Sequence, residues 1–220
     1  MDTLAPSAIE PNGSRAQRLD RLEALRSAFT GLDTEYPLAG GTAAPRTYLD
    51  SAASTLRCTV ADDIVRQALR HYANTHSKLH FGAHTMTHLY HEAHAIVEQF
   101  VDASDAYTSV FCGSGVTAGL NRMARVLSER RPDRDVVVTT MMEHHANDLP
   151  HRKHVGEVVH VPLEKDPEGE AGRVDMDALR RAIEEHADRL NYVAITAASN
   201  VTGIINPVHE VARLAHRAGA

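Results

Sequence analysis

The chain has 220 residues, 43% of them hydrophobic and 24% charged, as expected of one soluble globular domain or a large part of one. Its formal net charge of −6 disfavours broad binding to nucleic acid or acidic membranes, and 5% aromatic residues without Trp disfavour a base-stacking surface. No apolar run reaches the roughly 20 residues of a membrane span, and no charged-then-apolar leader opens the chain. Two cysteines, Cys58 and Cys112, make no disulfide framework, which favours a cytoplasmic location.

The N-terminal half of the chain predicts a tail and several helices. Residues 1–17 mix Pro, Ser, Gly and charge, which predicts a disordered tail. Residues 18–32 carry Leu and Phe at helical spacing, so they predict an amphipathic helix. After a loop to residue 46 we expect a strand over 47–50, a helix from a capping-box-like start at Thr59 to about residue 74, and a helix over 85–101.

From residue 108 onward, strands and helices alternate. The expected strands are 108–112, 135–140, 157–162 and 191–196, and the expected helices are 116–129, 175–187 and 207–218. The apolar runs 136–138 and 192–195 are continuous, as in strands buried on both faces. The fold class is therefore α/β, a mostly parallel sheet with flanking helices. Cys112 is expected in its core, and residues 164–172 in a charged surface loop.

The C-terminal helix has a stop signal in Gly219. In an alternating chain the next element would be a strand beside those already built, and none follows. A sheet left open there exposes an apolar edge. We therefore expect this chain to be the front part of a longer protein.

The most informative segment is Gly113-Ser114-Gly115-Val116-Thr117, between the expected strand 108–112 and the helix after it. Glycines let backbone N–H groups approach a ligand, and a helix start offers unpaired donors at the positive end of its dipole. The segment predicts a phosphate site. A glycine turn that only packs the helix on the strand is the alternative. A dinucleotide fingerprint is disfavoured, because the third glycine, Gly119, is displaced and the next strand ends without Asp or Glu.

Two polar segments follow strands at the edge where open α/β sheets place their ligands. Glu143-His144-His145-Ala146-Asn147 follows the strand 135–140, and a histidine there can stack on another ring or act as acid or base. The alternative is an exposed polar loop, and we expect one of the two histidines to be such a solvent-exposed loop residue. Ser199-Asn200-Val201-Thr202-Gly203 follows the strand 191–196. His151, Lys153 and His154 are expected in a solvated loop.

A row of histidines could instead bind metal. His84, His88 and His91 stand at i, i+4 and i+7, with His94 next, on one helix face. The HExxH pattern is not met, and no cysteine or carboxylate cluster accompanies the row. A solvated or interfacial helix face is therefore preferred, and a metal-binding protein, possibly a hydrolase, is kept as an alternative.

Together these segments resemble the class V aminotransferase family of pyridoxal-phosphate enzymes, in the branch of the cysteine desulfurases and selenocysteine lyases. The resemblance covers residues 47–220. The patches that carry it, in order, are Tyr48-Leu49-Asp50-Ser51-Ala52-Ala53, His80-x-Gly82-x-His84, Gly113-Ser114-Gly115-Val116-Thr117, Glu143-His144-His145-Ala146-Asn147, and Ser199-Asn200-Val201-Thr202-Gly203 with the helix closing at 215–220.

Composition and helical spacing thus predict a disordered tail (1–17) and an N-terminal helix and loop (18–46), and the resemblance implies that residues 47–220 are the N-terminal part of a pyridoxal-phosphate large domain. By it, Gly115, Val116 and Thr117 hold the cofactor phosphate, His144 stacks on the pyridine ring as the catalytic histidine, and Asn200 reaches the ring oxygen or the substrate carboxylate. Ala52, Ala53, His80 and His84 would line the substrate side. The implied cofactor is pyridoxal 5′-phosphate, the substrate an amino acid, and the full-length assembly a homodimer.

Departures from the family pattern leave the type of reaction open. Asp148-Leu149-Pro150-His151 stands where desulfurases carry an apolar pair, Pro and Trp, and Phe81 replaces an Arg, so transamination or epimerisation stays open beside desulfuration. The only lysines are Lys78, Lys153 and Lys165, and none has the Ser-x-His-Lys setting of the family's Schiff-base lysine. We therefore expect the chain alone to be inactive. A non-catalytic, truncated interaction module is a further alternative.

Overall fold

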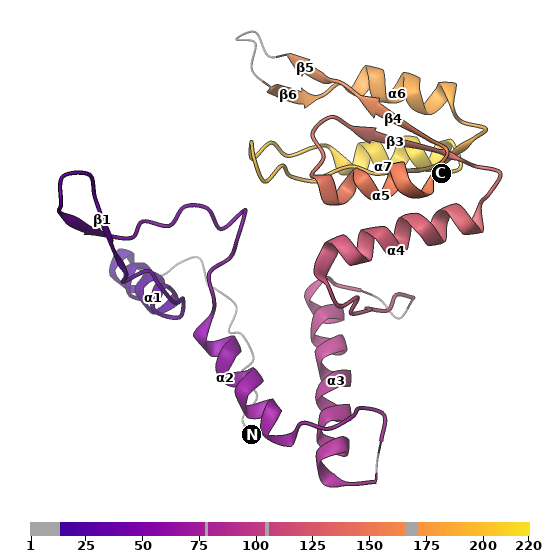
Figure 1. Cartoon of the computed structure of the whole chain (residues 1–220). Coiled ribbons are helices and arrows are strands. Elements are labelled where there is room, and N and C mark those ends of the chain that lie inside the picture. The colour runs from indigo at the N-terminus through magenta and orange to yellow at the C-terminus, as the bar shows by residue number, and fades with distance from the viewer. Residues whose placement is uncertain (1–13, 78, 104–105, 166–170) are drawn as a thin grey trace. The chain divides into compact units, whose positions relative to one another are not determined.

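The computed structural model describes residues 14–77, 79–103, 106–165 and 171–220, and the chain divides into two compact units, Met1–Ser109 and Val110–Ala220 (Figure 1). None of the helices among the described residues combines the length and apolar character that a membrane span requires. The predicted domain boundary at residues 46 and 47 remains a prediction.

The first unit contains helices and a short hairpin. Its elements are α1 (Arg15–Ser27), β1 (Glu35–Pro37), β2 (Ala43–Pro45), α2 (Thr59–Ala68), the 3-10 turn η1 (Leu69–His71) and α3 (Phe81–Phe100). The strands β1 and β2 pair antiparallel. The predicted helices are present with shifted ends.

The start of α1 corrects the predicted tail. Residues 1–13 lie outside the described residues, but Arg15 to Gln17 form the first helical turn. The reason is a capping box: the Ser14 hydroxyl accepts from the Gln17 N–H at 3.3 Å, and the Gln17 side chain accepts from the Ser14 N–H at 2.8 Å.

Two further predictions in this unit are wrong. Residues 47–50 are extended but not part of a sheet; instead the Tyr48 hydroxyl donates to the carbonyl oxygens of Asp50 and Ser54. Thr59 does not cap α2, because Cys58 is the N-cap residue and makes no side-chain capping bond. The Thr59 hydroxyl donates to Ala28 O at 3.2 Å, away from the helix start.

The second unit contains the predicted α/β sheet. Its elements are α4 (Gly115–Arg130), β3 (Val136–Thr140), the 3-10 turn η2 (His145–Asn147), α5 (Leu149–His154), β4 (Glu157–Val161), β5 (Leu163–Lys165), β6 (Ala171–Val174), α6 (Met176–Glu185), β7 (Leu190–Val193) and α7 (Val208–Arg217). β3 lies between β4 and β7 and pairs parallel with both. The fold class is confirmed.

Helices lie on both faces of this sheet. On one face α6 and α7 pack against the strands around a core of buried aliphatic side chains: Val138, Val161, Val174, Leu179, Ile183, Leu190 and Val211. The opposite face meets α4 and α5: the Asn191 side chain donates to Leu127 O of α4 and Tyr192 contacts His151 of α5. All five residues of β3 are buried, in agreement with the continuous apolar run of residues 136–138.

Three expectations for this unit are wrong. Residues 108–112 do not form a strand, and among the described residues no strand pairs with them, so Val110, Phe111 and Cys112 are exposed rather than in the core. The expected loop over 164–172 includes parts of an antiparallel hairpin of β5 and β6. His151, Lys153 and His154 lie on α5 rather than in a loop.

The predicted stop of the last helix is confirmed. α7 ends at Arg217, and Gly219 has a φ of 76°, the left-handed conformation that glycine adopts without strain. The Gly219 N–H donates to His216 O, and the Ala220 N–H donates to Ala215 O, both at 3.0 Å. This pair of bonds is a Schellman motif, which satisfies the last carbonyls of the helix.

Candidate functional site

The N-terminus of α4 is open to an anion. Its N-cap residue, Ser114, makes no side-chain capping bond, and no acidic residue stands in the first turn. Gly113 and Gly115 have φ of 80° and 67°, and a Cβ added at either, or at Gly119, would meet no atom of a non-adjacent described residue within 4 Å. These glycines therefore do not pack the helix on a strand, which removes that alternative. The exposed Thr117 adds a hydroxyl.

His144 begins the next candidate segment as the N-cap of η2. Its Nδ1 accepts a hydrogen bond from the Ala146 N–H at 3.0 Å, so in the neutral ring the proton lies on Nε2. The ring is exposed, as is that of His145, and the two ring centroids are 6.3 Å apart. His144 thus has a fixed backbone and an imidazole that is open to a ligand.

Asn200 lies at the tip of a tight turn after β7. The Ser199 hydroxyl accepts from the N–H groups of Val201 and Thr202, both at 3.2 Å, and the Gly203 N–H donates to Ser199 O at 2.9 Å. Ser199 is buried, whereas Asn200 is exposed. The serine fixes the turn, and the amide of Asn200 is left available.

Strand pairing and helix packing within the second unit relate these three segments to one another. β3 and β7 are parallel neighbours, so the segments after them, with His144 and Asn200, leave the same edge of the sheet. α4 packs against η2 and α5. The Ser128 hydroxyl donates to His154 O at 2.7 Å, which places the C-terminal ends of α4 and α5 together. The turn η2, which precedes α5, therefore lies toward the N-terminal half of α4.

The residues predicted for the substrate side lie in the first unit. Ala52, Ala53, His80 and His84 are all exposed there. His80 is the N-cap of α3, and its Nδ1 accepts from the Ala83 N–H at 3.3 Å. Their place on the substrate side stays a prediction.

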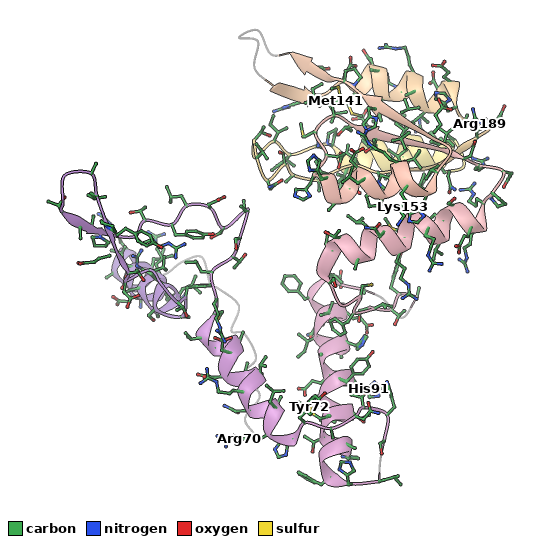
Figure 2. All side chains as sticks on the ribbon, in the orientation of Figure 1. Arg70, Tyr72, His91, Met141, Lys153 and Arg189 are labelled. Atoms are coloured by element: carbon green, nitrogen blue, oxygen red, sulfur yellow. The ribbon has the colours of Figure 1, made fainter. Side chains whose placement is uncertain are left out.

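The histidine row of α3 is not assembled into a ligand set. His84, His88 and His91 are exposed, and His91 packs edge-on with His76 at a centroid distance of 6.3 Å (Figure 2). His94 instead contacts Ser109 through Nδ1, 3.0 Å from its carbonyl oxygen. Among the described residues no group of three or more His, Cys, Asp or Glu side chains is placed to hold a metal ion.

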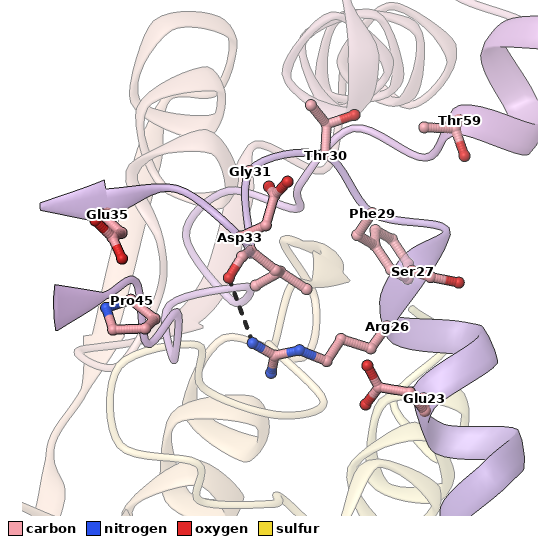
Figure 3. A pocket seen from close by; sticks show the side chains of 11 residues that line it. Glu23, Arg26, Ser27, Phe29, Thr30, Gly31, Asp33, Glu35, Pro45 and Thr59 are labelled. Carbon is pink, nitrogen blue, oxygen red and sulfur yellow. Dashed lines mark hydrogen bonds between the residues drawn. The ribbon is translucent and has the colours of Figure 1, made fainter.

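A cavity of about 590 Å³ lies in the first unit and contains none of the predicted residues. Residues of α1, β1 and the segment between them line most of it, and Arg26 donates there to Leu32 O at 3.4 Å (Figure 3). Glu23, Asp33 and Glu35 give it an acidic lining. It does not coincide with the segments that carry the phosphate and histidine motifs.

Sequence reasoning missed a polar cluster on α5, the helix that follows the turn η2. His151 is fully buried, and its Nδ1 lies 3.0 Å from the Tyr192 hydroxyl of β7. Burial lowers the pKa of His151, opposed by the Asn147 carbonyl and by the charges of Asp148 and Glu143. Burial also raises the pKa of Tyr192 to about 12. The partner of His151, Tyr192 of β7, lies 41 residues further along the chain. No local sequence pattern could therefore predict that His151 is buried.

Asp148, at the start of α5, anchors the other half of this cluster. Its carboxylate accepts from Arg152 at 2.8 Å and from His160 Nε2 at 2.7 Å. Burial alone would raise the pKa of Asp148, but the hydrogen bonds from Arg152 and His160 outweigh it and hold the pKa below its usual range. The departures from the desulfurase pattern at Asp148 and His151 therefore pack α5 on the sheet.

The sequence profile of the family "Aminotransferase class-V" matches residues 47–220. The chain is 32% identical to a probable cysteine desulfurase of Halalkalibacterium halodurans over 205 residues, 89% of this chain and 46% of the relative. It is 34% identical to a probable cysteine desulfurase of Halobacterium salinarum, over 90% of this chain and 46% of that protein. The chain thus spans less than half the length of these curated relatives.

Solved structures agree with this match. The apo cysteine desulfurase of Thermococcus onnurineus superposes with a TM-score of 0.63 at 27% identity, over 78% of this chain and 41% of that protein. The cysteine desulfurase CsdA of Escherichia coli gives a TM-score of 0.59 at 25% identity, over 90% of this chain and 46% of that protein. The profile match covers well over half of the sequence, and the parallel sheet supports it. The chain belongs to the class-V aminotransferase family.

Proposed function

We propose that this chain supplies the phosphate-binding and ring-stacking part of a pyridoxal-phosphate-dependent enzyme that acts on an amino acid. The observation that carries the proposal is the uncapped N-terminus of α4, with the turn that begins at His144 packed toward the same half of that helix. Cysteine desulfuration or a related lyase reaction comes first, because the relatives above are named cysteine desulfurases. Transamination or epimerisation is the alternative.

The residues present fit pyridoxal 5′-phosphate. A dianionic phosphate matches the amides of residues 115–117, which lack a capping side chain or a nearby acidic group, and the Thr117 hydroxyl. The flat, exposed imidazole of His144 matches a heteroaromatic ring. When bound, the cofactor supplies a pyridine ring that accepts electrons from the substrate.

Each residue of the chain then has a physical role. The helix N-terminus holds the phosphate in one place, and His144, whose Nδ1 is fixed by the Ala146 N–H, keeps one face of the ring covered and dry. Asn200 is exposed on a turn fixed by Ser199, so its amide can donate to a ring oxygen or a substrate carboxylate. These groups therefore bind the cofactor and orient it and the substrate.

Replacing His144 with Ala should weaken the binding of pyridoxal 5′-phosphate about 3- to 10-fold, since ring stacking is worth about 0.5–1.5 kcal/mol. The affinity for inorganic phosphate should not change, because the helix N-terminus is intact. Calorimetric titration of the purified chain with each ligand measures both constants.

The matched control for this change is His145→Ala. His145 is the exposed neighbour of His144 and follows it in the same turn, so its loss should leave both affinities unchanged. If the two variants behave alike, or if the unaltered chain binds the cofactor no more tightly than phosphate, the proposed function is wrong. A non-catalytic interaction module would give that second result.

We also propose that the chain alone does not complete the active site. Lys153 is exposed on α5 (Figure 2), Lys78 lies outside the described residues, and none of the three lysines stands in the family's Ser-x-His-Lys setting. After incubation with pyridoxal 5′-phosphate and reduction with borohydride, peptide mapping should find no lysine specifically modified. A single, fully modified lysine would overturn this expectation.

The partners of the whole protein are proposed from the family resemblance alone. They are a small amino-acid substrate and a second copy of the chain in a cytoplasmic homodimer, with no nucleic acid and no membrane. Size-exclusion chromatography with light scattering on the full-length protein tests the homodimer.

A further inference from the structure

The carboxylate of Glu143 joins three segments at the edge of the sheet. Its Oε1 accepts from the Thr140 hydroxyl at 2.7 Å and from the Thr196 N–H at 3.0 Å. Its Oε2 accepts from the Asn147 side-chain amide at 2.7 Å. The donors come from the end of β3, from the turn η2 and from the segment after β7, so one side chain ties all three together.

These bonds continue to the turn that carries Asn200. The side-chain amide of Asn206, itself buried, donates to Thr196 O at 2.8 Å, and its N–H donates to Ala197 O at 2.9 Å. The segments on either side of that turn are therefore fixed to Thr196, and Thr196 is fixed to Glu143. The position of His144 is in this way linked to that of Asn200.

An ionised carboxylate accepts from all three donors at once, with each partner in the orientation that the structure shows. An ionised Glu accepts at both oxygens, and hydrogen bonds to a charged acceptor are about twice as strong as neutral ones. A Gln in its place brings an NH2 group to face the Asn147 amide or the Thr196 N–H. Glu143 is half-buried, so water competes only in part for these bonds.

We propose that Glu143 is a positioning residue, which sets the orientation of His144 relative to Asn200 before the cofactor binds. The inference rests on the proposed function, because the orientation matters only if His144 stacks on the cofactor ring. Glu143 itself is not assigned a contact with cofactor or substrate.

If Glu143 acts through His144, removing both should cost no more than removing His144 alone. We expect Glu143→Leu to weaken pyridoxal 5′-phosphate binding about as much as His144→Ala does, about 3- to 10-fold, and the double variant to match the His144 single variant. Affinity for inorganic phosphate should stay unchanged in all of them. Asp135→Asn, which changes a carboxylate paired with Arg189 at the other end of β3, is the matched control.

A charge swap tests the contact itself. Asn147→Asp places two carboxylates face to face and should weaken cofactor binding, whereas Glu143→Gln combined with Asn147→Asp restores a donor and an acceptor and should recover it. The NMR signal of the His144 ring on adding cofactor should shift as in the unaltered chain only in the rescued variant. This readout does not depend on enzymatic activity.

The outcomes separate the two proposals. If the unaltered chain fails to prefer pyridoxal 5′-phosphate over phosphate, the proposed function falls and this inference falls with it. If the chain binds the cofactor and His144→Ala weakens it, but the Glu143 variants bind normally, only the positioning role is wrong. Additive losses, equal loss of phosphate binding, or no rescue by the swap would equally overturn the positioning role.

Discussion

Replacing Thr117 with Asp is expected to abolish the binding of pyridoxal 5′-phosphate, with a loss of affinity of at least about 100-fold. Two unit charges about 4 Å apart interact by about 4 kcal/mol at an effective dielectric of about 20, and the phosphate carries up to two negative charges. Thr117 stands in the first turn of α4, at the N-terminus assigned to that phosphate. Calorimetric or fluorescence titration measures the loss.

The same substitution should stabilise the folded chain slightly. A carboxylate in the first turn interacts favourably with the helix dipole, by about 0.3–1 kcal/mol at exposed sites. Lost binding together with unchanged or increased thermal stability therefore separates an electrostatic effect from misfolding.

Arg125→Gln is the matched control for Thr117→Asp, because it makes the same change of net charge further along α4. Arg125 is exposed and pairs with Glu129 one turn further along the helix, so cofactor affinity should change little. Unimpaired binding by Thr117→Asp would place the phosphate elsewhere.

The second unit is expected to lose stability as the pH falls below about 6.5 because of His151. The pKa of His151 in the folded chain lies below the usual 6.5. At pH values between the folded-state pKa and 6.5, the unfolded chain therefore binds more protons than the folded chain does. Stability from this group therefore rises with pH through that window and is constant above it. Asp148 affects stability only at a lower pH. Its pKa lies below 3.8, so its contribution to stability is lost only as the pH falls below that value.

His151→Phe should remove this part of the pH dependence and lower stability at neutral pH by about 1–3 kcal/mol, since the hydroxyl of the half-buried Tyr192 loses its partner. Adding Tyr192→Phe should recover most of that loss, because both partners are then apolar. Amide exchange of β3, whose five residues are buried, reports on this unit alone. His209→Phe, at an exposed position on α7, is the control.

An undiminished pH slope in His151→Phe would contradict the assignment of that slope to the buried imidazole. Other histidines of the chain titrate in both proteins, so only the difference between the two stability curves counts. A double variant less stable than His151→Phe would show that the contact with Tyr192 is not what stabilises the pair.

The two family departures at the start of α5 are explained by packing. Asp148 pairs with Arg152 and with His160 of β4, and His151 contacts Tyr192 of β7, so both side chains join α5 to the sheet.

The sequence by itself determined the three parallel strands β3, β4 and β7, the helices α4, α6 and α7, and the family. Continuous apolar runs mark strands buried on both faces, as in β3, and a glycine that can take a left-handed conformation marks the end of α7. These signals are local: a few neighbouring residues carry both the pattern and the conformation that it favours.

Only the tertiary structure decided which polar side chains are buried and what they contact. Glu143 reaches Thr196 across 53 residues and His151 reaches Tyr192 across 41, and the partner decides whether a buried polar group is stable. Residues 108–112 show the opposite case: the apolar run predicted a strand, but a strand also needs a neighbour for its backbone hydrogen bonds. Burial and pairing are properties of several distant segments together, so no local pattern encodes them.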